Sequence, residues 1–153
     1  MTAAAEKADP VSGLARHWID AVLARAPLAR HLGIRVDVVE TDRVVLGLPF
    51  SPGNVTVGSI VHGGVIATLI DIAGAAASAS GIGEEGASGG ATASLNIAYL
   101  AAADGVDLLA EARIIQRTRS GTVADVDVRD ASGRAIAKGL VTSRIFRSPR
   151  ASA

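Results

Sequence analysis

The chain has 153 residues, of which 49% are hydrophobic and 20% are charged, and its formal net charge at neutral pH is zero. These values are typical of one globular domain with a real core, and they argue against a surface built for nucleic acid or another polyanion. The absence of cysteine excludes a disulfide framework, a cysteine nucleophile and cysteine-based metal sites.

The domain organisation is simple. Residues 1–10 and 148–153 are expected to be disordered tails around a single domain that spans 11–147. No cationic segment followed by a long apolar one stands at the start, so we expect no signal peptide and a cytoplasmic protein.

An amphipathic helix is expected near the N-terminus. Asp9 and Pro10 are typical of a helix start, with the aspartate as cap and the proline in the first turn. The pattern ends near Pro27. The apolar residues that recur at helical spacing are Leu14, Trp18, Ile19, Val22, Leu23 and Ala26.

Two strands are expected next, over 34–40 and 43–50, because apolar residues alternate along both and a polar turn joins them. Residues 51–54 are expected to form a loop. Four more strands are expected after a central helix, at 90–100, 106–118, 122–130 and 134–147. In the third of these four, Ala124, Val126 and Val128 should face inward, while Asp125, Asp127 and Arg129 should face outward. No strand–helix–strand alternation is visible, which favours an α+β fold with an antiparallel sheet.

The central helix is expected to begin after His62, and from Val65 onward it is apolar or small on nearly every side, which is typical of a buried helix. Asp71 is the exception. A buried carboxylate must be hydrogen-bonded or have its pKa shifted, so Asp71 is a candidate functional residue. The alternative is an aspartate that faces solvent. A membrane span is rejected, because His62 and Asp71 would lie inside it.

Two glycines follow His62 where this helix begins. Helix N-termini present free N–H groups, and Gly63 and Gly64 would let another group approach them closely. Such an end can bind an anion or stabilise negative charge that develops on a carbonyl oxygen. The alternative is a tight entry turn.

Gly63 and Asp71 cannot act on one carbon atom from the same chain. They are eight residues apart, which is about 12 Å along a helix. If both act on one substrate, two copies of the chain must contribute to each site. The pattern therefore predicts a two-fold dimer with shared active sites.

Asn54, the run Gly58–Gly64 and Asp71 together resemble the signature of the hotdog-fold acyl-CoA thioesterases, specifically the phenylacetyl-CoA thioesterase-like branch. In that branch His-Gly-Gly opens the central helix, and an acidic residue follows nine positions after the histidine, as Asp71 follows His62. The resemblance extends over residues 28–146. It implies a curved antiparallel sheet wrapped around one central buried helix, with the N-terminal helix added, and it favours a dimer of dimers, that is, a homotetramer.

The same resemblance implies hydrolysis of an acyl-CoA thioester to a free acid and CoA. Asp71 would be the general base or the nucleophile, and the N–H of Gly63 from the partner subunit would polarise the carbonyl. His62 would orient this turn or contact the thioester. Thr92 corresponds to a hydroxyl that positions the attacking water in relatives, with an ordinary strand threonine as the alternative. Asn54 corresponds to a carbonyl-binding asparagine, although it stands eight residues before His62 where six is usual; a turn-forming role is the alternative.

Gly64, Arg117, Arg119 and Gly121 are the residues that the resemblance assigns to substrate binding, the last three near a turn that holds part of CoA in related proteins. For each arginine the alternative is a place on a solvated sheet edge. No metal or other cofactor is expected, because the histidines at 17, 31 and 62 lack ligand spacing. Gly81–Gly86 matches Gly-x-Gly-x-x-Gly but follows a helix, so we interpret it as a loop rather than a dinucleotide site. A hotdog dehydratase or hydratase, and a non-catalytic acyl-CoA-binding domain, remain the alternative functions.

Overall fold

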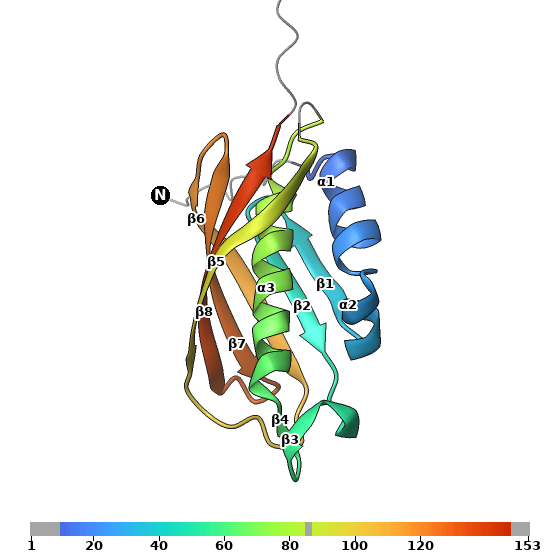
Figure 1. The fold of residues 1–153 in the computed structure, drawn as a ribbon, viewed down its shortest axis with the longest axis vertical. Coiled ribbons are helices and arrows are strands. Elements are labelled where there is room, and N and C mark those ends of the chain that lie inside the picture. Colours follow the sequence, from blue (N-terminus) through green and yellow to red (C-terminus); the bar gives the residue numbers. More distant parts are fainter. Residues whose placement is uncertain (1–9, 85–86, 148–153) are drawn as a thin grey trace, which may run out of the picture.

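A computed structural model describes residues 10–84 and 87–147 of the chain. Apart from Pro10, the two expected tails lie outside the described residues. Glu85 and Gly86 of the glycine-rich loop lie outside them too. The described part forms a six-stranded antiparallel sheet in the order β1-β2-β6-β7-β8-β5, which curves around helix α3 (Figure 1). The predicted α+β hotdog architecture is thus confirmed.

The six strands of the sheet are those predicted, and no strand end differs by more than two residues from its prediction. Alternating apolar residues specify strands well, because one face of each strand must be buried. The strands are β1 Arg35–Glu40, β2 Arg43–Leu48, β5 Gly89–Tyr99, β6 Leu108–Arg117, β7 Gly121–Asp130 and β8 Ala135–Phe146.

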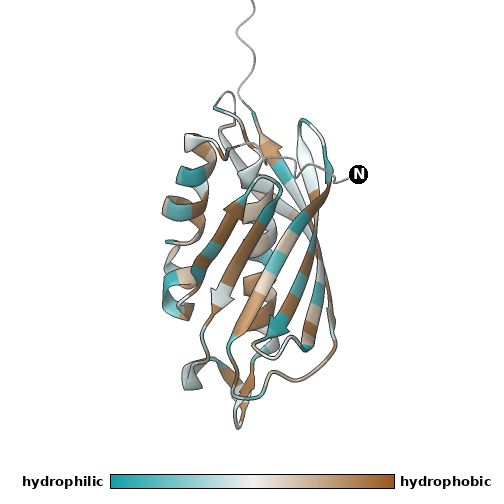
Figure 2. Ribbon diagram, turned by 180° about the vertical axis from the view of Figure 1, so that it is seen from behind, coloured by the Kyte–Doolittle hydropathy of each residue, from teal (hydrophilic) through white to brown (hydrophobic). Residues whose placement is uncertain are grey.

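Strand β7 shows how the pattern divides the sheet into two faces. Ala124, Val126 and Val128 are fully buried against the helix side, as predicted. On the outer face Asp125 and Asp127 bind Lys138 of β8, with nitrogen–oxygen distances of 2.7 and 3.1 Å. Figure 2 shows the resulting alternation of hydrophilic and hydrophobic residues along the strands.

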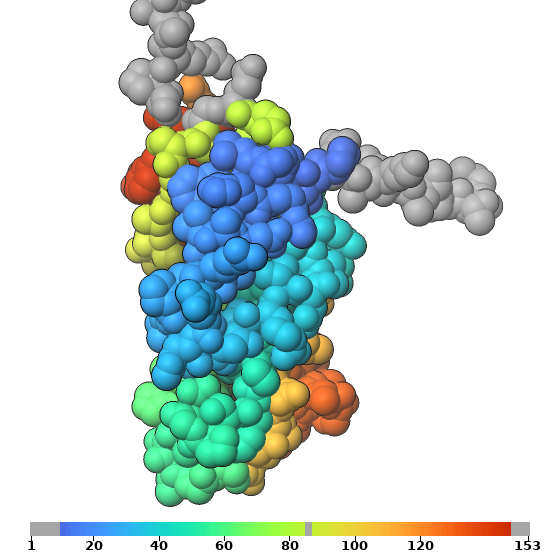
Figure 3. All heavy atoms as spheres, turned by 90° about the vertical axis from the view of Figure 1, so that its right-hand side faces the viewer, coloured from blue at the N-terminus to red at the C-terminus, as the bar shows by residue number. Residues whose placement is uncertain are grey.

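The N-terminal helix differs from its prediction. Three short pieces replace one helix: α1 Gly13–His17, the π-helical segment η1 Trp18–Leu23 and α2 Pro27–Leu32. Ser12, whose hydroxyl accepts from the Ala15 N–H, is the cap of α1, and Asp9 lies outside the described residues. Pro27 begins α2 rather than ending the earlier helix, since proline fits the first helical turn. Figure 3 shows these helices along one side of the molecule, next to the segment of β1 and β2.

A small hairpin follows a single turn of 3-10 helix, η2 Pro52–Asn54, where only a loop was expected. Strands β3 Val55–Val57 and β4 Ile60–Val61 pair with each other and not with the main sheet. Runs of two and three residues are too short for an alternating pattern to reveal them. The hairpin leads directly into the start of α3.

Helix α3, Gly63–Ser80, is the core of the fold. Leu69, Ile70 and Ala73 are fully buried between the helix and the sheet. By length and composition alone α3 would qualify as a membrane span, but 56% of it is buried inside this fold. Its apolar surface is therefore explained by the strands that surround it.

Helix and sheet approach each other unusually closely at two glycines. A Cβ atom added at Gly74 of α3 would lie 2.6 Å from Val141 Cβ, and one added at Gly139 of β8 would lie 2.4 Å from Ile70 Cγ2. These contacts fix both the height and the rotation of α3 on the sheet.

We expect Gly74→Ala to lower the free energy of unfolding by about 2 kcal/mol, because overpacking of about 3 kcal/mol outweighs the gain in helix propensity of about 1 kcal/mol. Urea denaturation measures the change. Gly83→Ala is the control, since its Cβ would have open space. An equal effect of the two substitutions would contradict the close approach.

Candidate active site

Asp71 and Thr92 are brought together across the helix–sheet interface. The Thr92 hydroxyl, on β5, donates a hydrogen bond of 2.6 Å to Asp71 Oδ1, in the middle of α3. Asp71 is half-buried and forms no ion pair among the described residues. Asp71 is thus less buried than predicted. Its carboxylate accepts one hydrogen bond from the described residues, which leaves lone pairs that can take a proton from water.

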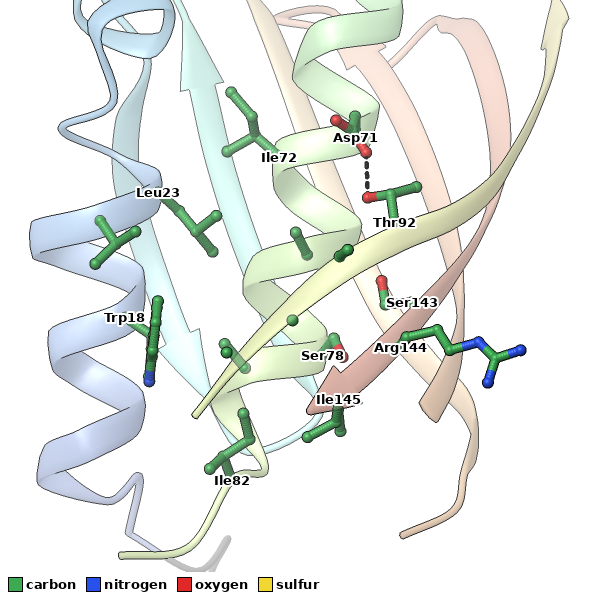
Figure 4. A pocket seen from close by; sticks show the side chains of 16 residues that line it. Trp18, Leu23, Asp71, Ile72, Ser78, Ile82, Thr92, Ser143, Arg144 and Ile145 are labelled. Atoms are coloured by element: carbon green, nitrogen blue, oxygen red, sulfur yellow. Dashed lines mark hydrogen bonds between the residues drawn. The ribbon is translucent and has the colours of Figure 1, made fainter. Parts of the chain in front are cut away.

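Asp71 lies on the wall of a mainly apolar cavity of about 220 Å³ between α3, the N-terminal helices and the ends of β5 and β8 (Figure 4). The π-helical turn explains one wall, because the wider turn directs residues at spacings of four and five into the cavity. The residues that η1 contributes are Trp18, Val22 and Leu23. Of four small helix residues that could line an acyl pocket, Ala67, Ala73, Ala75 and Ala76, only Ala75 does so.

The start of α3 offers one free backbone donor. The His62 side chain caps the helix, with Nδ1 accepting from the Gly64 N–H at 2.8 Å, so this nitrogen carries no proton. The carbonyl oxygen of His62 accepts from the N–H groups of Val65 and Ile66. The N–H of Gly63 has no acceptor among the residues that the structure describes. Of the two glycines, Gly63 is thus the one whose N–H is available to a ligand.

Tyr99, at the end of β5, holds this helix start in place. Its hydroxyl donates to the Gly63 carbonyl at 2.7 Å, and the two residues line a separate surface hollow near the β3–β4 hairpin. Neither residue reaches the cavity that contains Asp71. Within one protomer the two predicted halves of the site are therefore apart, as the spacing along α3 requires.

Asn54 is placed beside His62 by the short helix η2. Its backbone carbonyl accepts from the His62 N–H at 2.8 Å, and the residue is 9% exposed. This contact orders the turn that presents Gly63. Binding of a substrate carbonyl by the Asn54 side chain stays a prediction.

Arg117 is half-buried beside the C-terminal end of α3. Its guanidinium pairs with Asp42 at 2.6 Å and donates to the carbonyls of Ala77 and Ser78, at the C-terminal end of α3. A cation at this end of a helix satisfies free carbonyls and the negative end of the dipole. These bonds explain its presence without CoA, and its predicted role in CoA binding stays a prediction.

Arg119 and Gly121 lie at the β6–β7 turn, where Arg119 is exposed. Gly121 stands so close to β8 that an added Cβ would lie 2.7 Å from the Ser143 carbonyl oxygen. The surface hollow beside this turn shares Ser143 and Arg144 with the lining of the cavity that contains Asp71. Arg144 is exposed, and its guanidinium points away from the cavity interior (Figure 4). Sequence reasoning missed Arg144, because nothing in its own strand distinguishes it from other outward residues.

No group of three or more His, Asp or Glu residues that could hold a metal ion occurs among residues 10–84 and 87–147. The candidate chemistry is that of a carboxylate, a hydroxyl and a helix N-terminus. These groups suit attack by water on an activated carbonyl.

Comparisons with known proteins identify the class. Residues 58–137, more than half of the chain, match the model of the thioesterase superfamily. A Halobacterium salinarum protein, whose name proposes an esterase, is 32% identical over 153 residues, covering 92% of this chain and 95% of that protein. The fold is that of a hotdog protein, and the family match and this relative support a hydrolase. The chain belongs to the thioesterase superfamily.

Two examples show how well solved structures match the fold. The E. coli PaaI protein, from the phenylacetic acid degradation operon, superposes with a TM-score of 0.77 at 20% identity, covering 89% of this chain and 96% of that one. A hypothetical thioesterase of Streptococcus pneumoniae, solved with coenzyme A, gives a TM-score of 0.67 at 22% identity, covering 75% and 87% respectively.

We expect Arg117→Met to lower the free energy of unfolding by about 1–3 kcal/mol, because it removes charge-assisted hydrogen bonds to Asp42 and to the end of α3. Urea denaturation measures stability, and calorimetry measures the affinity for CoA. Arg119→Met is the control for stability, since this exposed side chain has no ion pair within the described part of the chain. A loss of CoA affinity without a loss of stability in Arg117→Met would contradict this structural role.

Proposed function

We propose that this protein hydrolyses an acyl-CoA thioester to a free acid and CoA. The observation that carries the proposal is Asp71, a half-buried carboxylate hydrogen-bonded to Thr92 on the wall of an apolar cavity. Membership of the thioesterase superfamily supports the reaction type. The solved relative with bound coenzyme A supports CoA as the thiol part of the substrate.

In this proposal Asp71 accepts a proton from water while the water oxygen attacks the thioester carbonyl carbon. The Thr92 hydroxyl donates to one carboxylate oxygen, which leaves the other free to act as the base. The tetrahedral intermediate then expels the sulfur, which takes up a proton to give free CoA. In the alternative role Asp71 attacks directly, and water hydrolyses the resulting anhydride.

The oxyanion needs a donor that the same chain cannot supply. The Gly63 N–H is the free donor at the start of α3, about 12 Å from Asp71 along the helix. We propose that Gly63 comes from a second copy of the chain. A dimer is then the smallest unit with complete sites, and a dimer of dimers would contain two such units.

Strand β5 is the surface that we propose for this dimer. It is an edge strand of the sheet, and nine of its eleven residues are exposed. An unpaired edge of this length invites pairing with another strand. A register centred near the middle of β5, with β5 antiparallel to its own copy, would bring the Thr92 end of one strand beside the Tyr99 end of the partner strand. Thr92 holds Asp71 and Tyr99 holds Gly63, so this register joins the two halves of the site.

The CoA portion requires cations near the mouth of the cavity. Arg144 lines the cavity and is exposed, Arg119 is exposed at the β6–β7 turn, and Gly121 lets that turn lie close to β8. We propose that these residues contact the CoA phosphates, since guanidinium groups bind phosphate strongly.

We expect Asp71→Asn to lower kcat for thiol release by about 10²–10⁴, because amide nitrogen and oxygen cannot replace a carboxylate base. The measurement is release of free CoA from a panel of short, long and aryl acyl-CoAs. If the wild type binds these esters but releases no thiol, the binding-domain alternative replaces the proposal. Hydration of an enoyl-CoA in place of thiol release would favour the hydratase alternative.

Gly63→Pro tests the oxyanion donor separately. Proline removes the N–H but suits the first helical position, and His62 already has φ −62° and ψ 133°, as a residue before proline prefers. We expect a loss of about 10²–10³ in kcat. Gly63→Ala is the matched control, because it keeps the N–H and its Cβ would make an ordinary contact of 3.5 Å with Tyr99.

Mixing the two inactive variants tests the shared site. In a dimer of one Asp71→Asn chain and one Gly63→Pro chain, one site has both wild-type groups. We expect co-refolded equal mixtures to recover about a quarter of the wild-type activity, since half of the dimers are mixed and each has one intact site. If both groups act within one chain, the mixture stays inactive.

A further inference from the structure

Three hydroxyl residues form a row across the inner face of the sheet. Thr92 on β5 and Thr122 on β7 are both register partners of Ser143, which lies on β8 between them. Partners in an antiparallel sheet point to the same face. All three side chains therefore face α3, and the row crosses a sheet face that is otherwise largely apolar.

Helix α3 satisfies both ends of this row and leaves the middle open. Thr92 donates to Asp71 at 2.6 Å, and Thr122 donates to Ser78 at 2.8 Å. Ser143 is only 5% exposed, and its buried hydroxyl has no hydrogen-bond partner among the described residues. A buried hydroxyl without a partner is unfavourable, so native proteins rarely keep one unless something else binds it.

Ser143 lies on the wall of the cavity that contains Asp71 (Figure 4). On the opposite wall the indole N–H of Trp18 is a second buried polar group that lacks a partner in the described part of the chain. The rest of the lining is mostly aliphatic, with Leu23, Ile72 and Ile145 among its members. The cavity thus combines apolar walls with hydrogen-bonding capacity that the protein itself leaves unused.

We propose that Ser143 is a specificity residue, which binds a neutral oxygen substituent, a hydroxyl or a carbonyl, on the acyl group of the substrate. This inference rests on the proposed thioesterase function and narrows its substrate class. A hydroxyl side chain can donate to either substituent and can accept from a hydroxyl. A charged carboxylate substituent is disfavoured, because Asp71 shares the cavity and the Arg144 guanidinium points away from it.

The geometry also places the oxygen substituent close to the thioester carbonyl. Ser143 is one strand away from Thr92, about 4.8 Å in a sheet, and Thr92 binds the carboxylate that acts at the thioester carbonyl. The oxygen substituent therefore lies a few bonds from the reacting carbon. The cavity volume of about 220 Å³ is below the usual range for drug-sized ligands and agrees with a small acyl group.

The test compares hexanoyl-CoA with hexanoyl-CoA that carries one hydroxyl at each successive carbon of the chain. For the wild type we expect kcat/KM to favour at least one hydroxylated member by about tenfold or more, because a site built to bind a hydroxyl discriminates against an analogue without it. In Ser143→Ala we expect this ratio to fall to near one, while kcat/KM for hexanoyl-CoA is unchanged or rises. The hydroxylated carbon of the best substrate shows how far along the acyl chain Ser143 binds.

Thr122→Val is the matched control, since its hydroxyl is in the same row but is already paired and does not line the cavity. We expect Thr122→Val to lower the melting temperature and keep the substrate ratio. Ser143→Ala should show the reverse, with a melting temperature that is unchanged or raised, because it removes an unpartnered buried group. A purely structural role of Ser143 would lower the melting temperature and leave the ratio intact, which overturns the inference.

Failure of the thioesterase function is distinguishable from failure of this inference. A protein that hydrolyses hexanoyl-CoA without preferring any hydroxylated member, and whose ratio Ser143→Ala does not change, retains the function and refutes the inference. If no member is hydrolysed, calorimetry with hexyl-CoA and hydroxyhexyl-CoA thioethers tests the same preference in binding. Equal affinities of the two thioethers would refute the proposed role of Ser143 for a protein that only binds acyl-CoA.

Discussion

The close packing of α3 against β8 is the constraint on which the rest of the structure depends. No side-chain atom fits at Gly74 beside Val141, or at Gly139 beside Ile70, so the helix is held at one height and one rotation on the sheet. Asp71 lies less than one turn before Gly74, and its carboxylate is thereby directed to Thr92 at the edge of the sheet. The same rigid helix keeps the free N–H of Gly63 far from that carboxylate. A carboxylate and a donor that cannot meet within one chain make a second copy part of the proposed chemistry.

Strand β5 connects the stability of the fold with its proposed function. A long exposed edge strand is a liability for a monomer, because its unpaired backbone groups can bind any other strand. In this chain the same strand holds Thr92 near one end and Tyr99 at the other, and each contacts one half of the proposed site. Self-pairing of β5 would remove the exposed edge and assemble the site in one step.

The cavity differs from the core next to it in how its polar groups are paired. Within the core, the Thr122 hydroxyl finds Ser78, and Arg117 satisfies the end of α3. At the cavity, the hydroxyl of Ser143 and the indole N–H of Trp18 are left without partners in the described residues. Since buried polar groups are normally satisfied, the unpaired ones separate a binding surface from structural packing.

The sequence by itself determined the elements that local patterns control. Alternation placed the six strands of the sheet, and the apolar run with its single charge identified α3 and Asp71. His62-Gly63-Gly64 marked the start of that helix, because capping depends on adjacent residues. The spacing of Gly63 and Asp71 also predicted their separation, since a helix has a fixed rise.

Only the tertiary structure decided what depends on strand order and register. The break of the N-terminal helix into α and π segments follows from packing, as does the use of Trp18 in the cavity wall. The ion pair of Arg117 with Asp42 joins residues 75 positions apart. The position of Ser143 between Thr92 and Thr122 requires three strands in a particular register. Contacts of this kind join residues that are distant along the chain, and no local pattern encodes which distant residues will meet.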